Sequence, residues 1–411
     1  MRIGWTSNAP WAPTGYGTQT NEIVPRLAAD GHKVAIMANY GFAGSTMEWR
    51  PGIPVMGQGL DAYSNDLTPA QIGNWINQTT EDGAGLGITL YDVWVYKSQQ
   101  WDEMPIASWT PVDHSGVPEE VKAWFNRKGK GKWAIAMSRF GERELLDAGL
   151  ERDRLFYAPH SIDLNIFKPT PSNIRADLNI PKDAHLTICP QANKGVTPIR
   201  KSWPELLLAW SRFAQKHTDA YLYLHTEMFG LANGTKLERL LKAVNAPMDR
   251  VRAVPQFAYR QGLDQAVLAK CYTAADVLLQ PSKGEGFGLP VLEALACSTP
   301  GVIVTNWTAM PELCGVGWKV GGQPEWDELQ TGWWMTPNVD EIEDALEQSY
   351  ALKGDTEKAK AASEAAVAFA SNYSTEKVYA ENWRPILKQI ESEIPKASGL
   401  NREQRRAAKH K

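Results

Sequence analysis

The sequence has few cysteines and no long apolar run. The four cysteines, Cys189, Cys271, Cys297 and Cys314, form no Cys-x-x-Cys pair. Their apolar or helical surroundings indicate buried free thiols rather than a metal site or a structural disulfide. No run approaches the roughly 18 apolar residues of a membrane span, and residues 1–11 lack the charged start and apolar core of a signal peptide. We therefore expect a cytoplasmic protein without a membrane span.

Excess positive charge is confined to one end of the chain. The net charge is −4, but residues 395–411 contain six Lys or Arg and one Glu, which leaves −9 for the other residues. An acidic body argues against nucleic acid as the main partner, because phosphate binding calls for a basic face. The basic tail is either solvated or in contact with an acidic surface. With 43% hydrophobic and 22% charged residues, the 411-residue chain is typical of a globular protein of two or three domains.

The first part of the chain alternates strand and helix patterns. A strand over 2–7, a glycine-containing loop to residue 17, a helix over 18–29 and a strand over 33–39 form a β-α-β opening. Further strand patterns occur at 88–95, 107–112, 133–137 and 155–158. Such alternation predicts a doubly wound parallel sheet with ligand loops at the carboxyl ends of its strands.

A second alternating series follows, so the fold class is α/β with two Rossmann-like domains. Strands are expected at 185–191, 220–227 and 276–280, and helices at 203–216, 236–244 and 261–273. Residues 338–370 are helical in pattern, and 373–394 form an amphipathic helix with Trp383, Ile386, Leu387 and Ile390 on its apolar side. Trp333 and Trp334 are expected to fill the second domain.

The most informative stretch runs from residue 280 to 313. It predicts a turn with glycines at 284, 286 and 288, a helix over 289–297, a strand over 302–305 and a turn at Pro311-Glu312. A glycine-rich turn at a helix start suits a phosphate, because backbone N–H groups point outward at the positive end of the helix. Glu285 and Glu293 bracket this turn, although either alone could be a solvated surface carboxylate.

The run Glu-Gly-Phe-Gly-Leu-Pro-Val-Leu-Glu over 285–293 resembles the signature of the retaining glycosyltransferases of family four, which have the GT-B fold. The resemblance implies that Glu285 lies against the donor sugar, that Glu293 binds the ribose hydroxyls of the nucleotide, and that Gly286, Phe287, Gly288 and Leu289 surround the donor. It also implies transfer with retention from a nucleotide sugar, for which UDP is favoured over GDP because UDP donors are commoner in the family. Ser298 stands where the family usually has glycine.

Four further segments fit the same resemblance. Gly15 and Gly17 match the loop that faces the donor phosphates, and Asp113 and His114 end a strand near the sugar and acceptor. Arg200 and Lys201, in a loop that also holds Lys194, match the cations that bind the diphosphate; Arg binds phosphate bidentately and Lys acts as a point charge. We list Glu285, His114, Asp113, Arg200 and Lys201 as catalytic candidates. Ser138, Arg139 and Phe140 match a family segment to which we assign no chemistry.

Residues 157–169 resemble the segment that joins the two domains in this family. Asp163 and Pro169 are kept, and His160-Ser161 replaces the usual Asn-Gly. We therefore expect an acceptor-side domain at 1–168, a donor-side domain at 169–372, a helix at 373–394 that crosses back to the first domain, and a basic tail. Transferases of the other fold often hold a metal with Asp-x-Asp, and no such triplet occurs here. We expect metal-independent transfer with no cofactor.

Three alternatives stay open at the level of sequence. One is an epimerase or phosphorylase on the same fold, and another is a non-catalytic protein that binds nucleotide sugars or glycans. The third keeps the enzyme and changes its acceptor to a protein or a nucleic acid, whereas the main expectation is a glycan, a small molecule or a protein hydroxyl. The tail faintly resembles basic ends of bacteriophage proteins, which suggests a viral enzyme acting in the host cytoplasm. The sequence does not give the oligomeric state.

Overall fold

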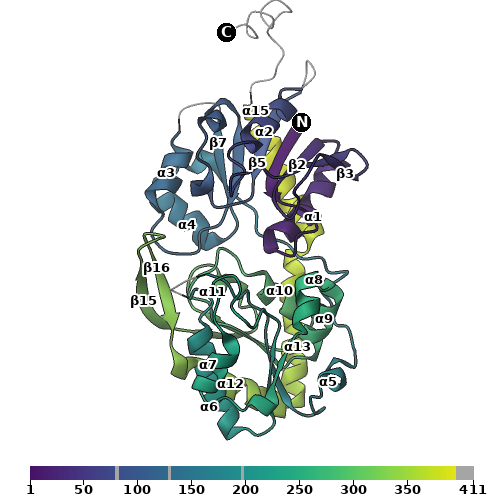
Figure 1. Ribbon diagram of the computed structural model, residues 1–411, viewed down its shortest axis with the longest axis vertical. Helices are drawn as coiled ribbons and strands as arrows, with labels where there is room; N and C mark the ends of the chain where they lie inside the picture. The colour runs from purple at the N-terminus through teal and green to yellow at the C-terminus, as the bar shows by residue number, and fades with distance from the viewer. Residues whose placement is uncertain (79–82, 128–130, 196–198, 395–411) are drawn as a thin grey trace, which may run out of the picture.

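The computed structural model of the chain describes residues 1–78, 83–127, 131–195 and 199–394. It consists of two lobes, each built around one sheet (Figure 1). Within the described residues the first lobe has an eight-stranded sheet in the order β3-β4-β2-β1-β5-β6-β7-β8, and the second a six-stranded sheet in the order β11-β10-β9-β12-β13-β14. The basic tail at 395–411 lies outside the described residues.

The first lobe is a mostly parallel sheet with helices between its strands. Only β3 runs antiparallel to its neighbour β4, and β1 and β2 are buried along almost their whole length, as in sheets covered on both faces. Its strands are β1 (Arg2–Asn8), β2 (Lys33–Tyr40), β3 (Met47–Arg50), β4 (Ile53–Met56), β5 (Gly85–Thr89), β6 (Ile106–Thr110), β7 (Lys132–Ala136) and β8 (Leu155–Tyr157). Its helices are α1 (Gly15–Ala29), α2 (Thr68–Ile76), α3 (Glu119–Phe125) and α4 (Arg139–Asp147).

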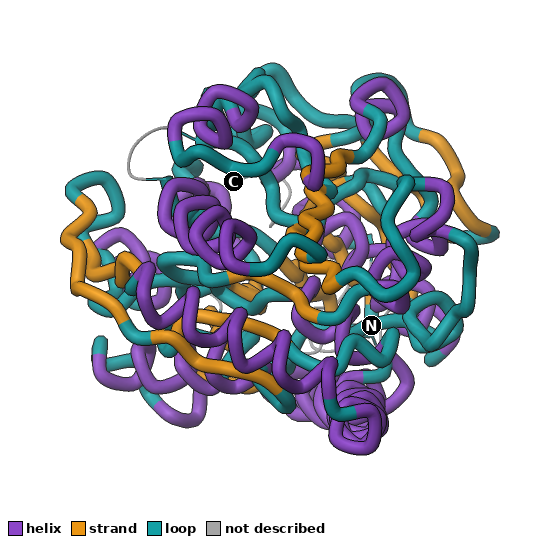
Figure 2. The backbone as a smooth tube through the Cα atoms, turned by 90° about the horizontal axis from the view of Figure 1, so that it is seen from below, coloured by secondary structure: helices purple, strands orange, loops and turns teal. Residues whose placement is uncertain are grey.

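The second lobe is a parallel sheet flanked by helices. Seen from below along the long axis of the molecule, several strand segments lie between helices (Figure 2). Its strands are β9 (His185–Cys189), β10 (Ala220–Leu224), β11 (Val251–Ala253), β12 (Val277–Gln280), β13 (Val302–Thr305) and β14 (Gly317–Val320). Its helices are α5 (Ile174–Asp177), α6 (Trp203–Lys216), α7 (Leu237–Ala243), α8 (Gln256–Gln261), α9 (Gln265–Ala274), α10 (Leu289–Ala296), α11 (Met310–Leu313), α12 (Val339–Gly354) and α13 (Thr356–Ala370).

Four expected elements have different bounds. Helix α1 begins at Gly15 rather than residue 18, because the Thr14 side chain caps it by accepting a hydrogen bond from the Gly17 N–H, at 3.0 Å. The strand expected at 88–95 ends at Thr89, and 93–95 form a 3₁₀ turn. The helix expected at 261–273 is two helices separated at Gly262, whose φ is +86°. The helical region 338–370 divides at Asp355, whose side chain caps α13.

The sequence analysis missed α2, α3, α5, α8, β3, β4, β11, β14 and an antiparallel ribbon of β15 (Gly322–Asp327) and β16 (Gly332–Pro337). The expectation that Trp333 and Trp334 fill the second lobe is wrong for Trp333, which is 45% exposed, whereas Trp334 is buried. The backbones of Trp333 and Ser115 exchange two hydrogen bonds, at 2.8 and 3.0 Å. The ribbon therefore joins the second lobe to the first (Figure 1).

The end of the described chain packs on the first lobe. It consists of α14 (Thr375–Val378), a π-helical turn (Tyr379–Trp383) and α15 (Arg384–Glu393). The Trp383 ring lies 4.8 Å from that of Trp109 and 5.8 Å from that of Trp5, measured between centroids. None of the described helices combines the length and the low polarity that a membrane span requires.

A carboxylate of the second lobe caps a helix of the first. Glu312 in α11 accepts hydrogen bonds from the backbone N–H groups of Arg139 (2.8 Å) and Phe140 (2.5 Å), the first two residues of α4. These donors have no partner within their own helix, and the positive end of the helix favours a carboxylate. The Pro311-Glu312 turn and the segment 138–140 therefore meet across the lobe boundary.

Candidate active site

A cleft of about 800 Å³ separates the two lobes. Segments after β1, β5 and β6 supply most of its first-lobe side, to which residues after β4, β7 and β8 and the end of β2 add, and segments after β9 and β12 supply most of its second-lobe side. In both sheets these loops flank the place where the strand order reverses, between β1 and β5 and between β9 and β12. Open parallel sheets bind ligands at this position.

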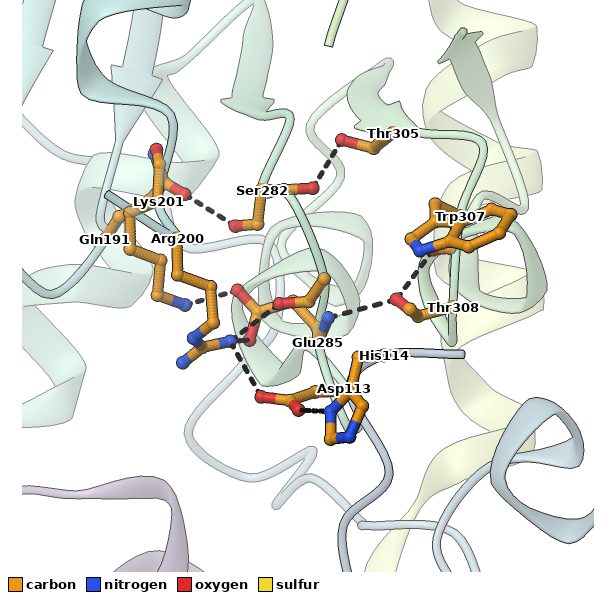
Figure 3. A network of polar contacts seen from close by, with 11 residues as sticks. Asp113, His114, Gln191, Arg200, Lys201, Ser282, Glu285, Thr305, Trp307 and Thr308 are labelled. Carbon is orange, nitrogen blue, oxygen red and sulfur yellow. Dashed lines mark hydrogen bonds and ion pairs between the residues drawn. The ribbon is translucent and has the colours of Figure 1, made fainter. Parts of the chain in front are cut away.

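Glu285 lies at the centre of a charged cluster in the cleft (Figure 3). Arg200 donates to its Oε2 and to the Gly284 carbonyl oxygen, both at 2.7 Å, and the Lys201 ammonium contacts its Oε1. The backbone N–H of Glu285 donates to the Thr308 hydroxyl at 3.0 Å. The loops after β9 and β12, which flank the switch point of the second sheet, thus hold the Glu285 carboxylate between two cations.

The cluster fixes the charge of Glu285. Burial alone would raise the pKa of this carboxyl, but the charges of Arg200 and Lys201 lower it to about 2. The two carboxylates Glu285 and Asp113 raise the pKa of Arg200, whereas burial lowers that of Lys201. Glu285 is consequently ionised at neutral pH, and the cations face the cleft with only part of their charge neutralised.

Asp113 extends the cluster into the first lobe. Its Oδ2 lies 3.8 Å from the Arg200 guanidinium, and its Oδ1 lies 2.8 Å from His114 Nδ1. Burial opposes ionisation of Asp113, but the hydrogen bond to His114 and the charge of Arg200 keep its pKa below the ordinary value. Asp113 lines the cleft; His114 does not, and packs instead against Gly332 of β16.

The glycine-rich turn brings the lobes close together. A Cβ added to Gly284 would lie 2.0 Å from the Asp113 carbonyl oxygen, and one added to Gly286 would lie 2.6 Å from Pro111 Cβ. Such distances admit no side chain, so these glycines permit contact between the second lobe's turn and the end of β6.

Two helix N-termini line the cleft from opposite sides. Gly288, the cap of α10, has φ +119°, and it lines the cleft together with Phe287, Leu289 and Pro290. Gly15 at the start of α1 also lines it, and a Cβ there would contact Leu289 at 3.4 Å. Gly17 does not line the cleft and packs on the backbone of Ala9 and Ala12, and its role in donor binding stays a prediction.

Glu293 lies inside the second lobe, beside the cleft rather than on its surface. It is 8% exposed, and the Tyr272 hydroxyl donates to its Oε2 at 2.9 Å. Burial raises the pKa of Glu293 to about 7, although the Tyr272 hydrogen bond opposes the shift. After α10, Ser298 has φ +66°, the left-handed conformation that favours the glycine usual at this position.

Several residues of the cleft carried no signal in the sequence. Tyr91 and Asp92 follow β5, and burial together with the charge of Asp113 raises the pKa of Asp92 to about 7. His160 stacks on Phe287 with centroids 5.1 Å apart, and burial lowers its pKa to about 3, so its imidazole is neutral. The only signal available was position, since each of these residues follows a strand of the first sheet.

The part of the chain that the structure describes contains no group of three or more His, Cys, Asp or Glu side chains arranged to hold a metal ion. The cleft's ligand-binding groups are instead three cations, Lys194, Arg200 and Lys201, and two helix N-termini. These groups suit an anion.

Comparison with known protein families gives a match within the second lobe. A family model described as "Glycosyl transferases group 1" matches residues 192–351, which hold Arg200, Lys201, Glu285 and Glu293. In these residues the chain is similar to the group 1 glycosyltransferases. This group 1 segment contains all the cations of the cleft named above and the whole glycine-rich turn.

Two curated relatives match part of the chain. The D-inositol 3-phosphate glycosyltransferase of Kineococcus radiotolerans is 32% identical over 176 residues, which are 40% of this chain and 38% of the relative. The O-antigen chain mannosyltransferase B of Escherichia coli is 50% identical over 44 residues, 11% of either chain. The first match thus spans well under half of the relative's length.

Solved structures match both lobes together. Sucrose-phosphate synthase from Thermosynechococcus elongatus has a TM-score of 0.70 at 19% identity, covering 95% of this chain and 99% of that one. Anabaena HepE in complex with UDP-glucose has a TM-score of 0.65 at 15% identity, covering 94% and 100%. The chain outside the group 1 segment therefore completes the GT-B fold, and the predicted fold class is confirmed.

Proposed function

We propose that the chain is a retaining glycosyltransferase that moves a hexose from a UDP- or GDP-sugar to a hydroxyl acceptor without a metal ion. The observation that carries the proposal is the position of Arg200 and Lys201 beside Glu285 at the N-terminus of α10, within the group 1 segment. HepE, a structural neighbour, is described in complex with UDP-glucose.

The charged groups of the cleft would bind the diphosphate of the donor and stabilise the charge that forms on it. A diphosphate at the α10 N-terminus would take up hydrogen bonds from Arg200 and Lys201, which gain a second anionic partner beside Glu285. Negative charge grows on the diphosphate as its bond to the sugar breaks, and preorganised cations stabilise that charge. Closure of the two lobes would hold the acceptor hydroxyl near the anomeric carbon. Glu293 would accept hydrogen bonds from the ribose.

Binding without catalysis, epimerisation and phosphorolysis are the competing functions. No observation on the cleft favours one of these three functions over transfer, because the same donor site would serve all of them.

The cytoplasmic location and the bacteriophage origin stay predictions from the sequence.

The test is thermal unfolding of the full chain against UDP-, GDP-, ADP- and TDP-sugars, each with and without EDTA. A ligand at 100 times its Kd should stabilise the fold by about 2.7 kcal/mol. Stabilisation by one nucleotide class, unchanged by EDTA, followed by an α-linked product from an α-linked donor, is the expected result. A shift that EDTA abolishes would contradict metal independence, and no shift with any nucleotide sugar would contradict the function.

A further inference from the structure

The two sides of the cleft differ in charge. Among the residues that the structure describes, the Lys and Arg side chains that line the cleft all come from the second lobe. The described first-lobe lining has aromatic and carboxylate side chains in their place: Tyr16, Tyr40, Tyr63, Tyr91, Asp92 and Asp113. This side lacks the side chains with which proteins usually bind phosphate.

Tyr16, Tyr91 and Tyr63 form one contiguous aromatic cluster. The Tyr91 ring lies 5.4 Å from Tyr16 and 6.3 Å from Tyr63 between centroids, with interplanar angles of 79° in both pairs. Tyr63 is 37% exposed and Tyr40 is 55% exposed, so parts of their rings are open to a ligand. Aromatic rings with a polar hydroxyl suit partners that are apolar on one face and hydroxylated at the edge, as sugar rings are.

Asp92 has an unused carboxylate in this surface. It follows β5 at the strand-order switch of the first sheet. No other residue of the described chain donates a hydrogen bond to its side chain or forms an ion pair with it, in contrast to Asp113 and Glu285. A carboxylate in a partly desolvated site is stabilised by hydrogen-bond donors, and ligand hydroxyl groups would supply them.

The remaining anion-binding feature of the first lobe faces the donor side. The N-terminus of α1 lies opposite α10, since a Cβ on Gly15 would contact Leu289. One of its N–H groups, that of Gly17, is already bound by Thr14. The carboxylate of Asp113, and that of Asp92 when it is ionised, would repel a second phosphate placed beside the tyrosines.

We propose that Tyr63, Tyr91 and Asp92 form the acceptor subsite, and that the acceptor is a sugar whose reacting ring carries no phosphate or other anionic group. The proposal rests on the proposed function and narrows it. It also separates this chain from the relatives named for D-inositol 3-phosphate, because the family match begins at residue 192 and includes none of these three residues. Tyr63 would contact a face of the sugar ring, Tyr91, which is 8% exposed, would pack behind Tyr63, and Asp92 would accept a hydrogen bond from a ring hydroxyl.

Saturation-transfer NMR on the full chain tests this directly. The probes are methyl glucoside, methyl mannoside and myo-inositol, each paired with a phosphorylated counterpart, with and without excess UDP or GDP. Signals from at least one neutral sugar should persist when the nucleotide is present. A phosphorylated sugar should be displaced by the nucleotide, because its phosphate would occupy the cations at Arg200 and Lys201.

Variants assign the signal to the surface. Asp92→Asn should weaken binding of the neutral sugar roughly tenfold, the loss typical of one hydrogen bond to a charged group. Tyr63→Ala, at a partly exposed position, should also weaken it. Glu103→Gln, an exposed carboxylate of the same lobe outside the cleft, is the matched control and should change nothing.

Two results would overturn the proposal: no neutral sugar binds, or a phosphorylated sugar resists the nucleotide and is lost in Asp92→Asn. Failure of the proposed function gives a different pattern. In that case neutral sugars still bind in an Asp92-dependent way, whereas no nucleotide sugar binds or no product forms.

Discussion

The two sides of the cleft are built on the same kind of sheet and differ in chemistry. The second lobe contributes Lys194, Arg200 and Lys201 around one ionised carboxylate, whereas the described lining of the first lobe contributes tyrosines and Asp92. Each set follows the strands beside a switch point. The scaffold therefore specifies where ligands bind, and the loop residues specify which charge the ligand carries.

The largest effect is expected at Glu285. Glu285→Ala removes the carboxylate that holds Arg200 and Lys201 in place, and kcat should fall by about 10²–10³-fold, the loss typical of a preorganised electrostatic group. Binding of the nucleotide should be largely intact, because both cations are then free to bind phosphate. Steady-state kinetics measures the fall in kcat, and calorimetry measures nucleotide binding. The matched control is Glu238→Gln, an exposed carboxylate of α7 in an ion pair with Lys242; parental turnover in Glu285→Ala would refute its role.

Glu293 should affect binding more than turnover. Glu293→Ala removes the buried acceptor expected to bind the ribose, so nucleotide Kd should rise by about 10- to 100-fold, corresponding to one or two hydrogen bonds to a charged group. Calorimetric titration with the free nucleoside diphosphate measures this change in Kd. Tyr272→Phe removes only the hydroxyl that donates to Glu293 and should weaken binding less. Equal effects of the two variants would point to a role in packing rather than in binding.

Glu312 tests how the two lobes are coupled. Glu312→Ala deletes the acceptor for the Arg139 and Phe140 N–H groups, and should lower the free energy of unfolding by about 1–2 kcal/mol, as the loss of a helix cap does. Because this contact crosses the lobes, kcat should fall several-fold while nucleotide Kd changes little. Ser138→Ala removes the cap that α4 receives from its own lobe and should destabilise the fold without the same loss of kcat.

A smaller effect is expected from pH. Burial raises the pKa of Glu293 to about 7, so in the free protein this carboxyl is mostly protonated below pH 7 and ionised above it. The ionised form is the better acceptor for ribose hydroxyls. Nucleotide affinity should therefore rise several-fold between pH 6 and pH 8, and the rise should be absent in Glu293→Gln. An identical pH profile in that variant would assign the titration to another group.

The donor side was largely accessible from the sequence because its residues form a continuous run. The turn, α10 and β13 follow one another within residues 280–313, and Arg200 and Lys201 precede α6, so a local pattern was enough to indicate them. The structure brings these residues together at Glu285. Glu293 is adjacent in sequence but faces Tyr272, since it points inward from a helix that is buried on almost all sides.

The acceptor side could not be read in this way. Tyr16 at the start of α1, Tyr63 after β4 and Asp92 after β5 come from three separate segments, and only the order β4-β2-β1-β5 in the sheet places them together. At Gly17 close packing on the backbone of Ala9 and Ala12 is by itself enough to require glycine, so the glycine pattern alone does not indicate a ligand there. The β15–β16 ribbon was missed because its residues contain Pro324, Gly332 and exposed side chains, whereas its stability depends on contacts with Ser115 in the other lobe.

The most direct test of the account is calorimetric titration of UDP and GDP into the parent chain, Arg200→Ala and Asp92→Asn under the same conditions. If the donor phosphate binds only on the second lobe, Arg200→Ala should raise the Kd of the binding nucleotide by at least about tenfold, the loss expected for a charge-assisted hydrogen bond to phosphate. Asp92→Asn should leave that Kd unchanged within error. Equal losses in both variants, or a loss in Asp92→Asn alone, would contradict the division of the cleft into a cationic donor side and an uncharged-sugar side.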